Sequence, residues 1–151
     1  MKDRRNFVVA ASAIAIALAY GPANAAGKYD PGASDTEIKI GNTNPYSGPA
    51  SAYGTIGKAI AAYFKMVNDK GGINGRKINF ISLDDSYSPP KTVEQIRKLV
   101  EQERVLFIFQ SLGTPTNTAI HKYMNAKKVP HLFVWGLPFL ENVPQSSGNN
   151  D

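Results

Sequence analysis

The sequence predicts an α/β fold, a doubly wound parallel sheet with the strand order 2-1-3-4 and helices on both faces. Short β-prone apolar runs alternate with longer amphipathic segments, and Gly, Pro and Asn residues separate them. The resulting order is strand, helix, strand, helix, strand, helix, strand, whose right-handed crossovers make the sheet parallel. A closed barrel needs roughly twice the 151 residues of this chain, so we expect an open sheet.

The first half of the predicted sheet consists of two strands joined by a helix. Residues 37–41 alternate in polarity and are expected to form the first strand, whereas the prolines and glycine of 42–53 indicate a loop. The helix ends at the C-capping pair Gly71-Gly72, and residues 77–83 are the second predicted strand. The apolar positions of the helix recur at helical spacing and are Ile56, Ile60, Tyr63, Phe64 and Val67.

The second half adds two more helices and two more strands. Ser88-Pro89 is predicted to begin the second helix, with the serine as cap and the proline in the first turn. The continuous apolar run 105–109 is typical of a strand buried on both faces. Thr114-Pro115 begins the third helix in the same way, and residues 129–134 are predicted to form the fourth strand, at the edge of the sheet.

The N-terminus has the three-part pattern of a signal peptide, predicted over residues 1–25. A basic start precedes an apolar run over 7–20, which is shorter than the ~20 residues that cross a bilayer. Small residues at Ala23-Asn24-Ala25 indicate cleavage near Ala25. The twin arginines Arg4-Arg5 leave both the Sec and the twin-arginine route open, and either predicts an extracytoplasmic, periplasmic location. Residues 26–36 form a polar lead-in.

Composition excludes several kinds of function. The absence of cysteine excludes a disulfide scaffold, a cysteine-ligated metal and a cysteine nucleophile, and we expect no cofactor and no metal. His121 and His131 have no partner that the sequence reveals. Residues 1–25 hold three of the 17 basic and one of the 12 acidic residues, which leaves a net charge of +3 without basic runs, so no nucleic-acid partner is expected.

Asp84-Asp85 is a pair of carboxylates for which two interpretations exist. Paired carboxylates can serve acid catalysis or hold magnesium. No histidine or third acidic residue stands near them in the sequence, so solvated charges at a loop or a helix start are favoured.

A ligand site is expected beyond the carboxyl ends of the first and third strands, where the strand order reverses. Segments 44–53 and 110–114 converge there. Gly113 would allow close approach of the backbone, Thr114 and Thr116 would offer hydroxyls, and the first-turn N–H groups of the third helix favour an anion such as a carboxylate. The alternative for Thr114 is that it only caps its own helix.

Two residues of the first loop complete the predicted site. Tyr53 would cover the apolar part of a ligand, unless it only packs against its own loop. Ser47 would contribute another hydroxyl, although Ser-Gly is also common in ordinary turns.

The sequence resembles the type I periplasmic binding proteins. The resemblance rests on Ile38–Gly41 followed by Pro45–Pro49, on Tyr53-Gly54, on the stretch Val67–Arg76 with its Asn-Asp-Lys-Gly-Gly-Ile-Asn-Gly run, and on Asp84-Asp85. It covers Glu37 to Val134 and is closest to the branched-chain amino-acid subfamily of ABC importers.

The resemblance implies a receptor that binds a solute and is not an enzyme. Two lobes would close on an amino acid and pass it to a membrane permease. The first lobe would hold the α-carboxylate and α-ammonium through the segment that matches Leu112, Gly113, Thr114 and Thr116, with the aromatic ring of Tyr53 against the ligand. Some members carry a disulfide at the positions of Tyr87 and Leu112, which this chain lacks.

The family is much longer than this chain, so residues 37–134 are expected to be a partial N-terminal lobe and 135–151 an unmatched tail. One wall of a closing site would leave a ligand hydrated, so weak or no binding is expected. Three alternatives stay open: a sensory receptor domain of the same fold, a small flavodoxin-like enzyme or phosphoacceptor domain, and the inactive product of a disrupted reading frame.

Overall fold

The computed structural model describes residues 29–136. The predicted signal peptide over 1–25 and residues 137–151 of the predicted tail lie outside this range. The elements are β1 (Glu37–Asn44), the 3-10 turn η1 (Ser51–Tyr53), α2 (Gly54–Asp69), β2 (Lys77–Asp84), α3 (Pro89–Arg97), the π-helical turn η2 (Lys98–Gln102), β3 (Phe107–Phe109), α4 (Thr114–Lys127) and β4 (His131–Leu132).

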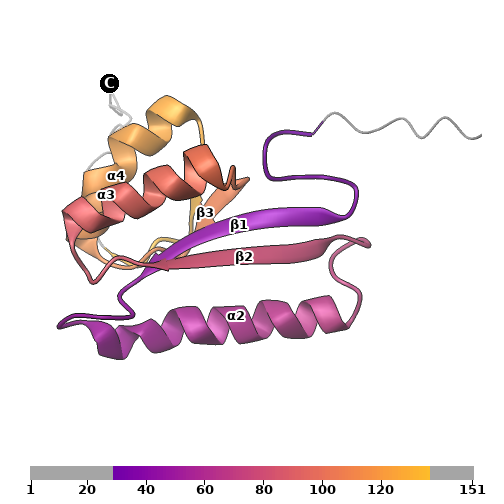
Figure 1. Ribbon diagram of the computed structural model, residues 1–151, viewed down its shortest axis with the longest axis horizontal. Coiled ribbons are helices and arrows are strands. Elements are labelled where there is room, and N and C mark those ends of the chain that lie inside the picture. Colours follow the sequence, from indigo (N-terminus) through magenta and orange to yellow (C-terminus); the bar gives the residue numbers. More distant parts are fainter. Residues whose placement is uncertain (1–28, 137–151) are drawn as a thin grey trace, which may run out of the picture.

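The four strands form one parallel sheet in the order β2-β1-β3-β4, which confirms the predicted fold. β1 and β2 pair along their full length, from Glu37 opposite Lys77 to Asn44 opposite Asp84. α2 covers one face of the sheet, and α3 and α4 lie side by side on the other (Figure 1). Within residues 29–136, no helix is both long enough and apolar enough to cross a membrane.

The main core lies between the sheet and the α3–α4 layer. Ile108 is completely buried there, whereas its neighbours Phe107 and Phe109 point to the α2 face and stay half-buried. On that face the ring of Phe64 packs between those of Phe80 (5.3 Å) and Phe109 (5.7 Å). We predicted that this strand is buried on both faces; β3 is fully buried on the face toward α3 and α4 and only half-buried on the face toward α2. The buried core residues are Ile96, Leu99, Val105, Ile108, Ile120 and Met124.

β1 extends three residues beyond its predicted end at Gly41, so the prediction that 42–44 belong to a loop is wrong. The three polar side chains Asn42, Thr43 and Asn44 are fully buried. Asn42 donates to the carbonyls of Phe109 (2.7 Å) and Gln110 (3.0 Å). Ser82 on β2 donates to Asn42 Oδ1 at 2.6 Å. These bonds satisfy an amide that the sequence pattern alone assigns to solvent.

The predicted helix caps differ from the observed ones. Ser88 stands at the N-cap of α3 without a side-chain capping bond, and its carbonyl accepts both the N–H (2.8 Å) and the hydroxyl (2.9 Å) of Thr92. α4 is capped by Gly113, so Thr114 is its first helical residue rather than its cap.

His131 has a buried partner that the sequence does not reveal. Ser111 donates its only hydroxyl proton to Asn117 Oδ1 (2.6 Å), so His131 Nε2 must carry the proton that it shares with Ser111 Oγ. Asn117 in turn donates to the Ser111 carbonyl at 3.2 Å. The network ties β4 to the segment between β3 and α4, and burial lowers the pKa of His131 to about 4.

This pKa predicts a loss of stability in mild acid. An unfolded histidine titrates near 6.5, above the folded value, so the contribution of His131 is complete above pH ~6.5 and decreases as the pH falls toward about 4. Between pH ~7 and pH ~4.5 the loss is on the order of 2 kcal/mol. Urea unfolding at both pH values should show a smaller drop for His131→Gln than for the wild type. His121→Gln is the matched control, and an equal drop in all three proteins would contradict the assignment.

Candidate functional site

An open cavity of about 460 Å³ lies at the carboxyl ends of β1 and β3, within the size range of small-molecule sites. It contains four of the six predicted site residues, Tyr53, Leu112, Gly113 and Thr114. Two loops far apart in sequence therefore meet as expected. The cavity is lined by Ala50, Tyr53, Ile56, Tyr87, Leu112, Gly113, Thr114, Trp135 and Gly136.

Gly113 forms a wall of the cavity in a conformation that favours glycine. Its φ is +110°, and a Cβ there would lie 2.5 Å from Cε2 of Tyr87 and 2.7 Å from Thr116 Oγ1. Its N–H donates to the Trp135 carbonyl at 2.7 Å, and its own carbonyl accepts the N–H of Asn117 at 3.0 Å. The Asn117 N–H thus makes the first backbone hydrogen bond of α4; of the residues before it in the helix, Pro115 has no N–H and Thr116 is fully buried.

Thr116 does not line the cavity. It is fully buried, and its single hydroxyl proton is shared between the carbonyls of Leu112 (2.6 Å) and Gly113 (2.8 Å). The hydroxyl therefore holds the turn that precedes α4. Thr114, two residues earlier, is exposed and does line the cavity.

Tyr53 ends the turn η1, and 59% of it is exposed. Its N–H donates to the Ala50 carbonyl at 3.0 Å, which closes the turn. The next residue, Gly54, packs so closely that a Cβ would lie 2.9 Å from the Pro45 carbonyl. The Tyr53 ring consequently lies at the rim of the cavity, on a turn that packs against the backbone of Pro45.

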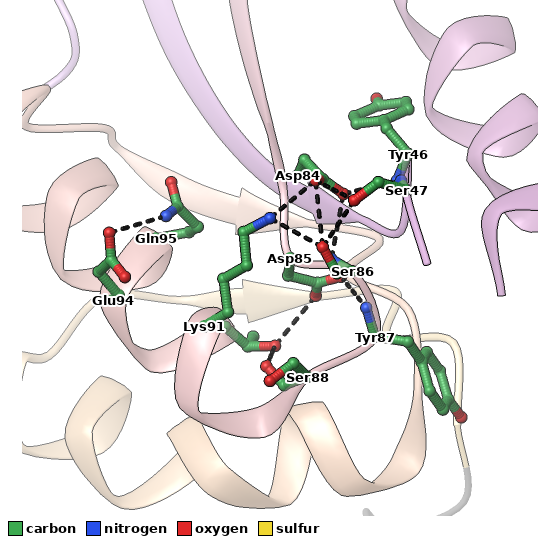
Figure 2. Close-up of polar contacts among 11 residues, drawn as sticks. Tyr46, Ser47, Asp84, Asp85, Ser86, Tyr87, Ser88, Lys91, Glu94 and Gln95 are labelled. Carbon is green, nitrogen blue, oxygen red and sulfur yellow. Dashed lines mark hydrogen bonds and ion pairs between the residues drawn. The ribbon is translucent and has the colours of Figure 1, made fainter. Parts of the chain in front are cut away.

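Ser47 lies outside the cavity and belongs to a polar cluster centred on Asp84 (Figure 2). Its hydroxyl donates to Asp84 Oδ2 at 2.6 Å and is 2.7 Å from Ser86 Oγ. The predicted ligand hydroxyl of Ser47 is thus engaged with its own protein.

Asp84 holds the two loops that follow β1 and β2 together. Its carboxylate accepts the N–H groups of Tyr46 (2.9 Å), Ser47 (3.0 Å) and Ser86 (3.0 Å), and Lys91 Nζ lies 2.8 Å away. Burial would raise the pKa of Asp84, but the hydrogen bonds from Lys91, Ser47 and Ser86 outweigh it and hold the pKa well below its usual range. Asp84 therefore stays ionised and serves as an anchor for the loop that carries Tyr53.

Asp85 is fully buried, so the expectation of a solvated charge is wrong for this residue. It accepts the N–H of Tyr87 (3.0 Å) and the hydroxyl of Thr92 (3.0 Å). Burial raises its pKa, against the opposing effect of these hydrogen bonds. The bonds hold Tyr87 at a φ of +58°, with its ring directed away from both carboxylates (Figure 2). Among the described residues, no group of three or more His, Cys, Asp or Glu side chains could hold a metal ion.

Five lining residues were not among the predicted site residues, although one of them, Ala50, lies in the segment 44–53 that was expected at the site. For Tyr87 the signal was the resemblance, in which a disulfide joins its position to that of Leu112; a left-handed backbone turns its ring toward Gly113. Ile56 was visible only as part of an apolar helix pattern. Trp135 and Gly136 follow the predicted fourth strand, where carboxyl-end position was the signal that could have identified them.

The comparison with known families decides the ancestry of the chain. The family model described as periplasmic binding protein matches residues 37–150. The chain belongs to this periplasmic binding protein family. The matched range continues beyond Val134, where we placed the end of the resemblance in the sequence. The type I architecture expected from that resemblance agrees with the observed sheet order.

Relatives of this periplasmic binding protein are considerably longer than the chain. It is 36% identical over 78 residues to the Leu/Ile/Val-binding protein homolog 1 of Brucella abortus (strain 2308), which covers 51% of the chain but only 21% of that protein. A branched-chain amino acid transporter substrate binding protein of Streptococcus pneumoniae, solved with isoleucine, matches with a TM-score of 0.60 and 26% identity over 64% of this chain and 28% of that one.

A third similar protein was solved with a different ligand. It is a solute binding protein of an ABC transporter from Rhodopseudomonas palustris BisB5, in complex with 3,4-dihydroxy benzoic acid. The TM-score is 0.59 at 27% identity, over 66% of this chain and 27% of that one.

Replacing Gly113 by alanine should destabilise this periplasmic binding protein through both backbone strain and a clash with Tyr87. Gly71 is the matched control, because its φ of +107° is close to the +110° of Gly113 but no atom lies within 4 Å of its Cβ position. We expect Gly71→Ala to lower the free energy of unfolding by about 1–2 kcal/mol. Gly113→Ala should lose a further 1–3 kcal/mol or so. Equal losses in urea unfolding would show that Tyr87 does not press on Gly113.

Removing the Asp84 carboxylate should release the loop that carries Tyr53. In Asp84→Ala the amides of Tyr46, Ser47 and Ser86 lose a charged acceptor, and we expect their hydrogen exchange to become about tenfold faster or more. Asp69→Ala is the control, because it breaks only the exposed pair with Lys65. Unchanged exchange at the three amides would rule out the anchor.

Proposed function

We propose that this chain is the solute-binding component of an ABC importer for branched-chain or related amino acids and acts outside the cytoplasm. The observation that carries the proposal is the single cavity that brings Tyr53 together with Leu112, Gly113 and Thr114. Two loops that have no sequence relation enclose a space of ligand size at the edge where parallel sheets bind ligands.

The chemistry of the cavity suits a small carboxylate. The first turn of α4 places the positive end of the helix dipole beside Gly113 and Thr114, both of which line the cavity. A carboxylate is stabilised near the positive end of a helix dipole. The apolar remainder of the solute would lie against Tyr53, Ile56 and Leu112.

The named ligands of similar proteins support this choice. Isoleucine and 3,4-dihydroxy benzoic acid differ in everything except a carboxyl group and small size. Both structures match about two thirds of this chain, at more than 25% identity. A shared carboxylate end with a variable remainder is consistent with a site that holds the carboxylate and differs in its other walls.

The binding component of an importer works with a membrane permease, and we include that partner and a periplasmic location in the proposal. The signal pattern over residues 1–25 and the periplasmic binding protein family support the location. The family and fold are those of solute-binding proteins, so the proposal involves binding without catalysis.

We expect the affinity of this chain to be low. More than half of the Tyr53 and Trp135 surfaces is exposed at the cavity, so a ligand there remains largely hydrated. Hydration weakens charged hydrogen bonds, because water screens them.

An NMR titration with isoleucine tests the proposal. The amides of Tyr53, Leu112, Gly113 and Thr114 should shift together along one binding curve in the millimolar range, about 4 kcal/mol of binding free energy. Thr114→Val removes a hydroxyl that lines the cavity and should weaken binding about two- to tenfold. Thr118→Val removes a hydroxyl that donates to the Thr114 carbonyl on the same helix and should leave affinity unchanged. Shifts scattered outside the cavity, or none for any amino acid or organic acid, would refute the proposal.

A further inference from the structure

Three aromatic side chains from three different segments line the cavity: Tyr53, Tyr87 and Trp135. Tyr53 is 59% exposed and Trp135 is 52% exposed. A large aromatic side chain buries about 150–250 Å² when fully covered, so each of these two leaves roughly half of that area open. A ligand that covered this exposed apolar surface would be stabilised.

Tyr87 is held in the cavity by its backbone. Its N–H donates to buried Asp85 at 3.0 Å, and both Tyr87 and the preceding Ser86 adopt positive φ values of +58° and +51°. Its ring atom Cε2 lies 2.5 Å from the position that a Cβ on Gly113 would take. The ring thus lies directly over the glycine wall.

Trp135 is also fixed by its backbone. Its N–H donates to the Ser111 carbonyl at 3.0 Å, and its carbonyl accepts from Gly113 at 2.7 Å. These bonds form a parallel bridge between Trp135 and Leu112, both of which line the cavity. The tryptophan is therefore attached to the same wall that Tyr87 covers.

We propose that the solute of this cavity is an aromatic carboxylic acid, whose ring packs among Tyr53, Tyr87 and Trp135. The proposal rests on the carboxylate-binding cavity proposed above, and it assigns an aromatic ring, rather than a branched aliphatic chain, to the remainder of the solute. Aromatic pairs gain energy beyond area burial through edge-to-face and offset-stacked contacts, which a saturated or branched aliphatic chain does not reproduce. The aliphatic side chains in the lining are limited to Ala50, Ile56 and Leu112.

Matched ligands separate aromaticity from size and from the carboxylate. Benzoate and cyclohexanecarboxylate have the same carboxylate and ring size, and only the first ring is aromatic; isoleucine serves as the branched-chain comparison. Trp135 is the single tryptophan of the sequence, so its fluorescence reports directly on the cavity. Saturation-transfer NMR on the whole chain provides a second measurement that does not depend on ligand absorbance.

We expect benzoate to bind about three- to tenfold more tightly than cyclohexanecarboxylate and isoleucine. Tyr53→Leu should remove most of this preference. Tyr63→Leu is the matched control, because Tyr63 is 58% exposed on α2, nearly the same as Tyr53, but does not line the cavity. Both tyrosines are exposed, so neither variant should affect folding.

The possible outcomes separate this inference from the proposed function. Equal affinities, tighter binding of isoleucine or cyclohexanecarboxylate, or a benzoate preference that Tyr53→Leu leaves intact would overturn the aromatic assignment and leave carboxylate binding standing. No binding of any of the three ligands at about 10 mM would overturn the proposed function, and the aromatic assignment with it.

Discussion

The polar end of β1 is the constraint on which the rest of the structure depends. Asn42 reaches across the sheet to the carbonyls of Phe109 and Gln110, and its own oxygen accepts from Ser82 on β2. Ser82 is also 2.5 Å from the hydroxyl of Tyr46, in the loop after β1. Because Asn42 is fully buried, leaving its amide unpaired would cost about 1–3 kcal/mol. The network therefore connects the loop that carries Tyr53 to the strand that precedes Gly113.

The adjacent carboxylates Asp84 and Asp85 hold different segments of the site in place. Asp84 is partly exposed and gathers N–H groups from the loops after β1 and β2, so it remains charged at all ordinary pH values. Asp85 is buried and turns Tyr87 toward Gly113 through a strained left-handed backbone. Asp84 and Asp85 thus have different roles although both are aspartates, because successive positions at the end of a strand face different environments.

Sequence reasoning recovered the sheet order and four of the nine residues that line the candidate cavity. Alternation, helical spacing and proline positions are local signals, and they correctly placed α2, α4 and the glycine wall at Gly113. The hydroxyls of Ser47 and Thr116 were expected to face a ligand, but each finds a protein acceptor instead, the first on Asp84 in another loop. Ser47 meets an acceptor 37 residues away, which no local pattern reveals, whereas Thr116 bonds back to carbonyls of its own turn.

The sequence by itself determined the order of strands and helices, the parallel sheet and the edge at which the candidate cavity lies. These properties follow from short-range periodicity, and chirality leaves little choice in the crossovers. Only the tertiary structure decided that Tyr87 and Trp135 enter the cavity, that Asp85 is buried and that His131 pairs with Ser111. These features depend on the parallel register of the strands, which brings residues more than 15 positions apart into contact. They also depend on positive-φ backbone conformations, which persist only where the surrounding packing compensates their strain.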